Sequence, residues 1–254
     1  MKFLTKIVAT LALLPALVFA GEEGFPLDHA PDRSTDLAAL QNGAKVFVNY
    51  CLNCHSASSM RYSRLKDIGL TDDQIRSNLL FAGEKVGDLM TTPLTKADAK
   101  VWFGAAPPDL SVIARAKSSE AGSGTDWLYT YLRSFYKDDT RPTGWNNMLF
   151  PSVAMPHALW ELQGVQTAKF VEKEDEHEPG KKVQVFSKFE TVTPGKLTPA
   201  QYDSEVADLV AYLQWMGEPA QGTRKQLGVW VVLWLIILSF LAWRLNASYW
   251  KEVK

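Results

Sequence analysis

Cys51 and Cys54, the only two cysteines of this 254-residue chain, stand three positions apart, and His55 follows directly. Two thiols at this spacing can each form a thioether with one vinyl group of a haem, while the adjacent imidazole reaches the iron from the proximal side. The motif therefore predicts one covalently attached c-type haem. Such a large apolar cofactor supplies core surface, so the chain around it can fold with little regular structure.

Two other kinds of site use a cysteine pair at this spacing. A structural zinc ion needs four ligands, and the sequence has no second cysteine pair to complete them. A thioredoxin-like dithiol stands at a strand-to-helix junction in a βαβ unit, which the surrounding pattern does not offer. The dithiol remains the main alternative to haem attachment.

The N-terminal segment predicts export. Lys2 and Lys6 precede an apolar run over 7–19, and Val18-Phe-Ala20 stands before Gly21 as a cleavage site, so 1–20 is interpreted as a cleavable signal peptide. A retained membrane anchor is less favoured because the apolar run is short for a span. Export also suits haem attachment, since thioether formation belongs to an oxidising compartment outside the bacterial cytoplasm.

The other end of the chain predicts a membrane anchor. Residues 227–243 form an uncharged run rich in tryptophan, and Arg244, Lys251 and Lys254 follow it. A buried core helix is the alternative. We expect a transmembrane anchor over 224–246, a cytoplasmic tail over 247–254 and a c-type haem domain over 21–223 in the periplasm. The protein would then be a single-pass protein of the inner membrane.

Net charge disfavours one class of partner. The expected periplasmic body carries 20 basic and 27 acidic side chains, a net charge of −7 with neutral histidines. This balance argues against nucleic acid and favours electrostatic steering of a basic soluble partner.

The body is expected to be one mainly helical domain, since no repeat or long linker divides it. After a cap at Ser34 or Thr35, apolar residues recur at helical spacing from Leu37 to Phe47 and lead to Cys51. Gly43 would let a second helix, over 204–216, cross closely. Shorter helical stretches are expected over 72–81 and 126–135.

A surface β-hairpin is predicted over 169–192, because apolar strand-like segments flank a charged stretch that contains Pro179 and Gly180. An acidic cluster occupies its centre, comprising Glu172, Glu174, Asp175, Glu176 and Glu178. A solvated hairpin tip is favoured for this cluster over a docking patch.

The sixth ligand of the iron decides between electron transfer and ligand chemistry. Met155 lies in a proline-bracketed apolar loop, 100 residues after His55, which is long enough to return on the far face of a haem. Met148 and His157 belong to the same segment, and from spacing alone the three stay open as candidates.

Several segments together resemble the cytochrome c1 family, the haem subunits of ubiquinol:cytochrome c oxidoreductase. These segments are 51–55, Met60-Arg-Tyr-Ser-Arg-Leu65, Ala106-Pro-Pro-Asp-Leu-Ser111, Ala154-Met-Pro156 and Tyr212-Leu-Gln-Trp-Met-Gly-Glu-Pro219. The match extends over nearly the whole mature chain and includes the C-terminal anchor. It implies a class I cytochrome c-like haem domain with a small hairpin insertion.

The resemblance also implies site residues. Cys51 and Cys54 would be the thioether sites and His55 and Met155 the axial ligands, although His157 leaves bis-histidine coordination open. Arg115 corresponds to the family's arginine that meets a haem propionate, with an exposed surface arginine as the alternative. Pro107 and Pro108 would form part of the haem wall.

The resemblance implies a role in electron transfer between proteins. One electron at a time would pass from a Rieske iron–sulfur protein to a soluble or membrane-bound cytochrome c, with cytochrome b as a further neighbour. Two alternatives stay open: another membrane-anchored c-type cytochrome that donates electrons to a terminal reductase, and a haem-based gas-binding sensor with an open sixth position.

Overall fold

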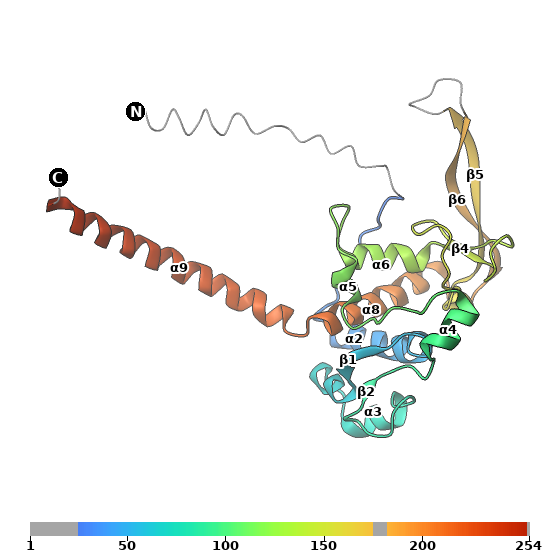
Figure 1. Cartoon of the computed structure of the whole chain (residues 1–254), viewed down its shortest axis with the longest axis horizontal. Helices are drawn as coiled ribbons and strands as arrows, with labels where there is room; N and C mark the ends of the chain where they lie inside the picture. The colour runs from blue at the N-terminus through green and yellow to red at the C-terminus, as the bar shows by residue number, and fades with distance from the viewer. Residues whose placement is uncertain (1–24, 175–181, 253–254) are drawn as a thin grey trace.

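The computed structural model describes residues 25–174 and 182–252 and shows a mainly helical body with small two-stranded sheets (Figure 1). The predicted signal segment 1–20 lies outside the described residues, as do Asp175, Glu176 and Glu178 of the predicted hairpin tip. In chain order the body contains α2 (Leu37–Val46), η1 (Phe47–Cys51), β1 (Ala57–Arg61), η2 (Tyr62–Ile68), α3 (Asp72–Asn78), β2 (Leu89–Met90), α4 (Lys96–Phe103), α5 (Ile113–Ala116), α6 (Gly124–Arg133), β3 (Phe135–Lys137), β4 (Trp145–Asn147) and α7 (Trp160–Gln163). The strands β5 (Gly164–Glu174) and β6 (Lys182–Pro194) follow, and then α8 (Pro199–Gly217), α9 (Gln221–Tyr249) and η3 (Trp250–Glu252).

Helix α2 is the first predicted element, and its cap differs from the prediction. The N-cap is Asp36, whose carboxylate accepts hydrogen bonds from the backbone N–H groups of Ala38 and Ala39. The expected cap at Ser34 or Thr35 was wrong because Ser34 hydrogen-bonds to Asp32 in the preceding turn. The predicted core face is confirmed from Leu40 onward, while Leu37 is exposed.

Helix α8 packs against α2 at a close crossing. Helix α8 begins at Pro199, five residues before the predicted start, because Thr198 and Gln201 form a capping box and proline fits the first turn. Gly43 of α2 faces the backbone carbonyl of Asp208 and the side chain of Tyr212. The predicted close contact at Gly43 is therefore confirmed, and it brings two buried apolar faces together.

Charged side chains hold the segment before α2 against α6 and link α6 to α8. Arg133 of α6 lies 2.7 Å from the carboxylate of Asp28 and 2.6 Å from that of Asp203 in α8. The backbone N–H of Ala30 donates to Asp126 over 2.8 Å. Through these contacts the segment that contains Asp28 and Ala30 lies against helix α6, which forms one side of the pocket described below.

The predicted hairpin is present and longer than expected. Strands β5 and β6 pair antiparallel from Gly164 opposite Pro194 to Glu174 opposite Lys182. Figure 1 shows this hairpin projecting from the body as an arm. Phe25 packs edge-on against Phe186, so the start of the described chain contacts the hairpin.

Helix α9 is the one helix in the described part of the chain that is long and apolar enough to cross a membrane. It extends from the body as a single rod (Figure 1), and its side chains are almost all exposed. It begins three residues before the anchor predicted over 224–246 and ends three residues after it. At its start, Arg224 pairs with Glu218, the capping residue of α8.

Replacement of Gly43 by alanine tests the crossing of α2 and α8. A Cβ atom at this position would lie 2.7 Å from Cβ of Tyr212 and closer still to the carbonyl of Asp208. Because backbone cannot move aside locally, we expect Gly43→Ala to lower the free energy of unfolding by about 3 kcal/mol. Urea unfolding followed by far-UV circular dichroism measures it.

Gly87→Ala is the matched control, since nothing lies within 4 Å of a Cβ atom there. Its unfolding midpoint should stay close to that of the parent protein. Equal stability of the Gly43→Ala variant and the parent would contradict the close crossing.

Candidate haem-binding pocket

A cavity of about 340 Å³ lies between segments that are far apart in the sequence. Its walls come from the turn 50–55, the segment 105–110, helix α6, the loop 150–156 and helix α8. Most of the side chains that line it are apolar, and Leu209 and Leu213 of α8 are buried at its back. A cavity with this apolar lining can bury much of the surface of a planar apolar cofactor.

The turn 50–55 brings both cysteines and the histidine to one wall of the cavity. Helix α2 continues into the π-helical turn η1, in which the N–H of Leu52 donates to the carbonyl of Phe47. The N–H groups of Cys54 and His55 then both donate to the carbonyl of Cys51, over 3.1 and 2.8 Å. This tight turn directs the side chains of Cys51, Cys54 and His55 toward the cavity.

The two thiols do not have the character of a redox dithiol. Both cysteines are free. Burial raises the pKa of Cys51 to about 12, with a further contribution from Cys54, and burial also raises the pKa of Cys54. A reactive dithiol needs a lowered thiol pKa. Among residues 25–174 and 182–252 no cluster of histidine, cysteine or acidic side chains could hold a metal ion by itself, which also disfavours zinc.

His55 is oriented by a backbone carbonyl. Its Nδ1 lies 2.8 Å from the carbonyl oxygen of Pro108, so the tautomer with its proton on Nδ1 donates to that oxygen. Nε2 is then left with its lone pair, as an iron ligand requires. Burial lowers the pKa of His55, although the Pro108 carbonyl and the charge of Asp109 oppose the shift. The imidazole is therefore held neutral.

Asp109 holds the segment that carries this carbonyl, a role that sequence analysis missed. Its carboxylate accepts hydrogen bonds from the N–H and hydroxyl of Ser58, over 2.8 and 2.6 Å, and from the N–H of Ser111 over 2.8 Å. Burial acts to raise the pKa of Asp109, but the hydrogen bonds from Ser111 and Ser58 together outweigh it and lower the pKa to about 2. The acidic residue two positions before Ser111 was the available signal, since aspartate commonly accepts from the N–H two residues on.

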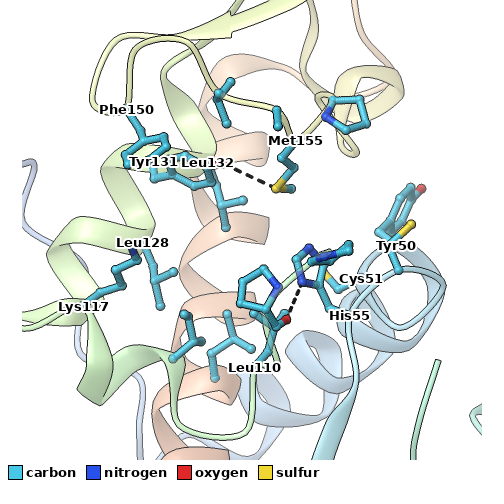
Figure 2. Close-up of a pocket in the computed structure, with 18 of the residues that line it drawn as sticks. Tyr50, Cys51, His55, Leu110, Lys117, Leu128, Tyr131, Leu132, Phe150 and Met155 are labelled. Atoms are coloured by element: carbon cyan, nitrogen blue, oxygen red, sulfur yellow. Dashed lines mark hydrogen bonds between the residues drawn. The ribbon is translucent and has the colours of Figure 1, made fainter. Parts of the chain in front are cut away.

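Met155 lies on the wall opposite His55. Figure 2 shows the thioether and the imidazole pointing into the same space from opposite sides. The hydroxyl of Tyr131 lies 3.5 Å from Sδ of Met155, and the indole of Trp127 stacks on the Tyr131 ring at 4.7 Å. The segment of Pro107 and Pro108 lines the cavity as predicted.

The two other candidates for the sixth ligand lie outside the cavity lining. His157 is buried and stacks on Phe135 with nearly parallel rings, 5.0 Å apart. Burial lowers its pKa to about 4. Met148 belongs to the turn after β4, where its N–H donates to the carbonyl of Ser134. The position of Met155 favours it over both.

Arg115 is exposed, and it does not line the cavity. It belongs to α5, where its side chain is close to Gly217, and its charge acts on Glu218. The described residues that line the cavity include one lysine and no arginine. The lysine is Lys117, two residues after Arg115. Sequence analysis did not single out Lys117, because a lysine near the end of a short helix is ordinary.

This set of residues fits a covalently bound haem: two free thiols at one edge, an oriented neutral imidazole on one wall, a thioether on the other, and apolar side chains between them. With the long apolar helix α9, the fold and the pocket define a c-type cytochrome with one C-terminal helix of membrane-spanning length.

Comparison with known proteins gives the family. The model of the cytochrome c1 family matches residues 29–253, so the chain belongs to this family. Family membership makes the protein an electron carrier and implies a covalent haem c.

Three relatives match over most of their length. The chain is 46% identical over 249 residues to a cytochrome c1 of Allochromatium vinosum, covering 97% of this chain and 98% of the relative. It is 43% identical over 253 residues to a protein of Nitrosomonas europaea named ammonia monooxygenase gamma subunit, covering all of both. It is 30% identical over 247 residues to a cytochrome c1 of Rhodospirillum rubrum, covering 86% of this chain and 83% of the relative.

The variant Asp109→Asn tests the carboxylate that fixes the Pro108 segment. At pH 7 we expect the free energy of unfolding to fall by about 1 kcal/mol, because the three donors use both carboxylate oxygens and the amide keeps only one acceptor oxygen. The folded-state pKa of about 2 lies below the ordinary value, so the contribution is present above pH 4. It is lost as the pH falls through 2, and the two proteins should converge there.

Asp139→Asn serves as the control, because Asp139 pairs with Lys137 at an exposed site away from the cavity. Urea unfolding of the haem-loaded proteins between pH 7 and pH 2 measures the differences. A gap between Asp109→Asn and the parent that widens toward low pH would contradict this role.

Proposed function

We propose that this chain is the cytochrome c1 subunit of a bacterial ubiquinol:cytochrome c oxidoreductase. It would accept one electron at a time from a Rieske iron–sulfur protein and pass it to a periplasmic cytochrome c. The match of the cytochrome c1 family over residues 29–253 carries the choice of complex. The placement of His55 and Met155 on opposite walls of a pocket that Cys51 and Cys54 also line supports the role of electron carrier.

The haem, when bound, supplies a one-electron iron couple. Cys51 and Cys54 would fasten it through thioethers, and His55 and Met155 would hold its iron. The Pro108 carbonyl orients the imidazole and raises its basicity as a ligand. The neutral thioether favours the reduced state and raises the potential.

The surroundings of Met155 support a closed sixth position. The Tyr131 hydroxyl contacts its sulfur, Trp127 stacks on the Tyr131 ring, and Phe135 packs edge-on against that ring. These aromatic contacts hold the thioether toward the cavity. A gas sensor needs an exchangeable sixth position, so this arrangement favours electron transfer over sensing.

Helix α9 supports action at a membrane. An anchor of this kind would hold the pocket in the periplasm beside the electron donor and raise the effective concentration of the two partners. Arg244 near the far end of α9 and Lys251 in η3 beyond it agree with a cytoplasmic tail by the positive-inside bias. The expected neighbours are cytochrome b and a Rieske protein.

A second candidate has a specific basis. The relative from Nitrosomonas europaea is named as a subunit of ammonia monooxygenase and matches the whole chain. A shared electron-carrier domain would serve either complex, since pocket and anchor make no distinction between them.

Purification of the full chain from its native membrane in mild detergent distinguishes the complexes. We expect cytochrome b and a Rieske iron–sulfur protein to co-purify in fixed proportion and the eluate to reduce cytochrome c with ubiquinol. Recovery with monooxygenase or terminal reductase subunits, without cytochrome b, would overturn the proposed complex.

The variant Met155→Leu tests the sixth ligand. We expect the haem to stay attached, shown by peroxidase stain at the protein's mass on a denaturing gel. The reduction potential should fall by on the order of 100 mV or more, or the reduced protein should bind carbon monoxide rapidly at neutral pH.

Met148→Leu makes the same change in the same segment outside the cavity lining, and it should keep the parent spectrum and potential. A Met155→Leu variant with an unchanged spectrum and potential would eliminate Met155 as ligand.

A further inference from the structure

Asn147, the last residue of β4, is a buried polar residue that lies outside the cavity lining, and it is only 1% exposed. Its Oδ1 accepts hydrogen bonds from the backbone N–H groups of Leu149 and Phe150, each over 3.0 Å. The hydroxyl of Ser134 donates to the same oxygen over 3.2 Å, and Nδ2 donates to the carbonyl of Tyr131 over 2.8 Å. One amide group therefore joins the loop that follows β4 to the end of α6.

Asn146, the residue before it, holds the middle of the same loop. Its Oδ1 accepts from the N–H groups of Asn147 and Ser152, both over 2.9 Å, and Arg141 donates to the carbonyl of Ser152 over 3.0 Å. Ser152 has a φ of 63°, in the left-handed region that serine rarely adopts. Its backbone conformation therefore depends on the contacts that its N–H and carbonyl make. Met155 follows three residues later.

The two asparagines matter because residues 148–156 form neither helix nor strand. A segment of this kind lacks the regular hydrogen bonds that fix a helix or a sheet, so side chains have to supply them. The Asn147 amide attaches the start of the loop to the backbone of Tyr131. At the other end, the Tyr131 hydroxyl contacts Sδ of Met155, as the dashed line in Figure 2 shows. The loop is thus attached to α6 at both ends.

We propose that Asn147, with Asn146 as a second support, is a positioning residue that keeps Met155 at the sixth position of the haem iron. The inference rests on haem attachment and on Met155 as a ligand under the proposed function. It does not depend on which complex the chain joins. A ligand carried by an irregular loop leaves the iron whenever the loop moves away. The hydrogen bonds of Asn147 stabilise the closed loop and so lower the population with an open sixth position.

Imidazole is the probe for this population, because it binds the iron of the oxidised protein at the sixth position only after Met155 has left. Its apparent dissociation constant is the intrinsic constant divided by the fraction of open molecules. Spectroscopic titration of the full haem-loaded chain measures it. The charge-transfer band between the thioether and ferric iron reports Met155 ligation before imidazole is added.

Asn147→Leu keeps the approximate size of the side chain and removes its hydrogen bonds. The buried N–H groups of Leu149 and Phe150 then lose their acceptor in the closed loop, whereas water can satisfy them in the open one. We expect the open fraction to rise about tenfold, so imidazole should bind about tenfold more tightly than it does to the parent.

Ile75→Ala is the control for a general loss of stability. Ile75 is fully buried in α3 and lies outside the cavity lining, so the variant loses stability by leaving a space in the core. Its imidazole affinity should stay close to that of the parent. An Asn147→Leu variant with the parent's imidazole affinity would overturn the proposal, and so would an increase no larger than that of Ile75→Ala.

Asn146→Ala decides the question if Asn147→Leu does not fold. Asn146 is only half-buried, and its loss removes the acceptor of the Ser152 N–H. Imidazole should then bind about threefold more tightly, and an unchanged affinity would overturn the proposal.

The parent protein separates the two levels of inference. A parent without haem stain on a denaturing gel, or without the charge-transfer band, overturns the proposed haem site together with this positioning role. A parent that shows both, with variants whose imidazole affinity does not change, overturns the positioning role alone.

Discussion

The close crossing of α2 and α8 at Gly43 is the contact on which the rest of the pocket depends. Helix α2 leads directly into the turn that carries Cys51, Cys54 and His55, and α8 supplies the buried leucines at the back of the cavity. A side chain at Gly43 would push the backbones apart. Because the turn 50–55 and the α8 side of the cavity are both attached to this crossing, a displacement there would move the imidazole relative to Leu209 and Leu213.

The pocket needs two further supports, since α2 and α8 provide only part of it. The segment 105–111 has no regular structure, and its position depends on the Asp109 carboxylate bound to Ser58. On the opposite wall, the Met155 loop depends on the aromatic packing around Tyr131 in α6. Irregular chain on both sides of a haem is thus fixed by a few specific contacts, while the apolar cofactor would fill the space between.

The ionisable side chains in and around the pocket differ in charge. The pKa of His55 is lowered by burial, which suits a neutral ligand. Asp109 stays ionised through its three donors, outside the cavity lining. Lys117 brings a positive charge to the rim, on the side away from the cysteines. The pocket therefore combines an apolar interior with a charged rim, as a cofactor with an apolar ring and anionic edge requires.

Sequence by itself determined the haem motif, the mainly helical class, the individual helices, the hairpin and the apolar C-terminal helix, because each follows from spacing between near neighbours. It also predicted the crossing of α2 and α8, because Gly43 leaves room for a second helix to approach closely. Spacing alone left Met155, Met148 and His157 as candidates for the sixth ligand, and the family resemblance favoured Met155. The same resemblance singled out Arg115, which does not line the cavity, and passed over Lys117, which does. Tertiary structure alone placed Lys117 at the cavity, His157 against Phe135 and Asp109 on Ser58. Those placements depend on how irregular segments return to the helices, and such long-range contacts have no periodic signal in the chain.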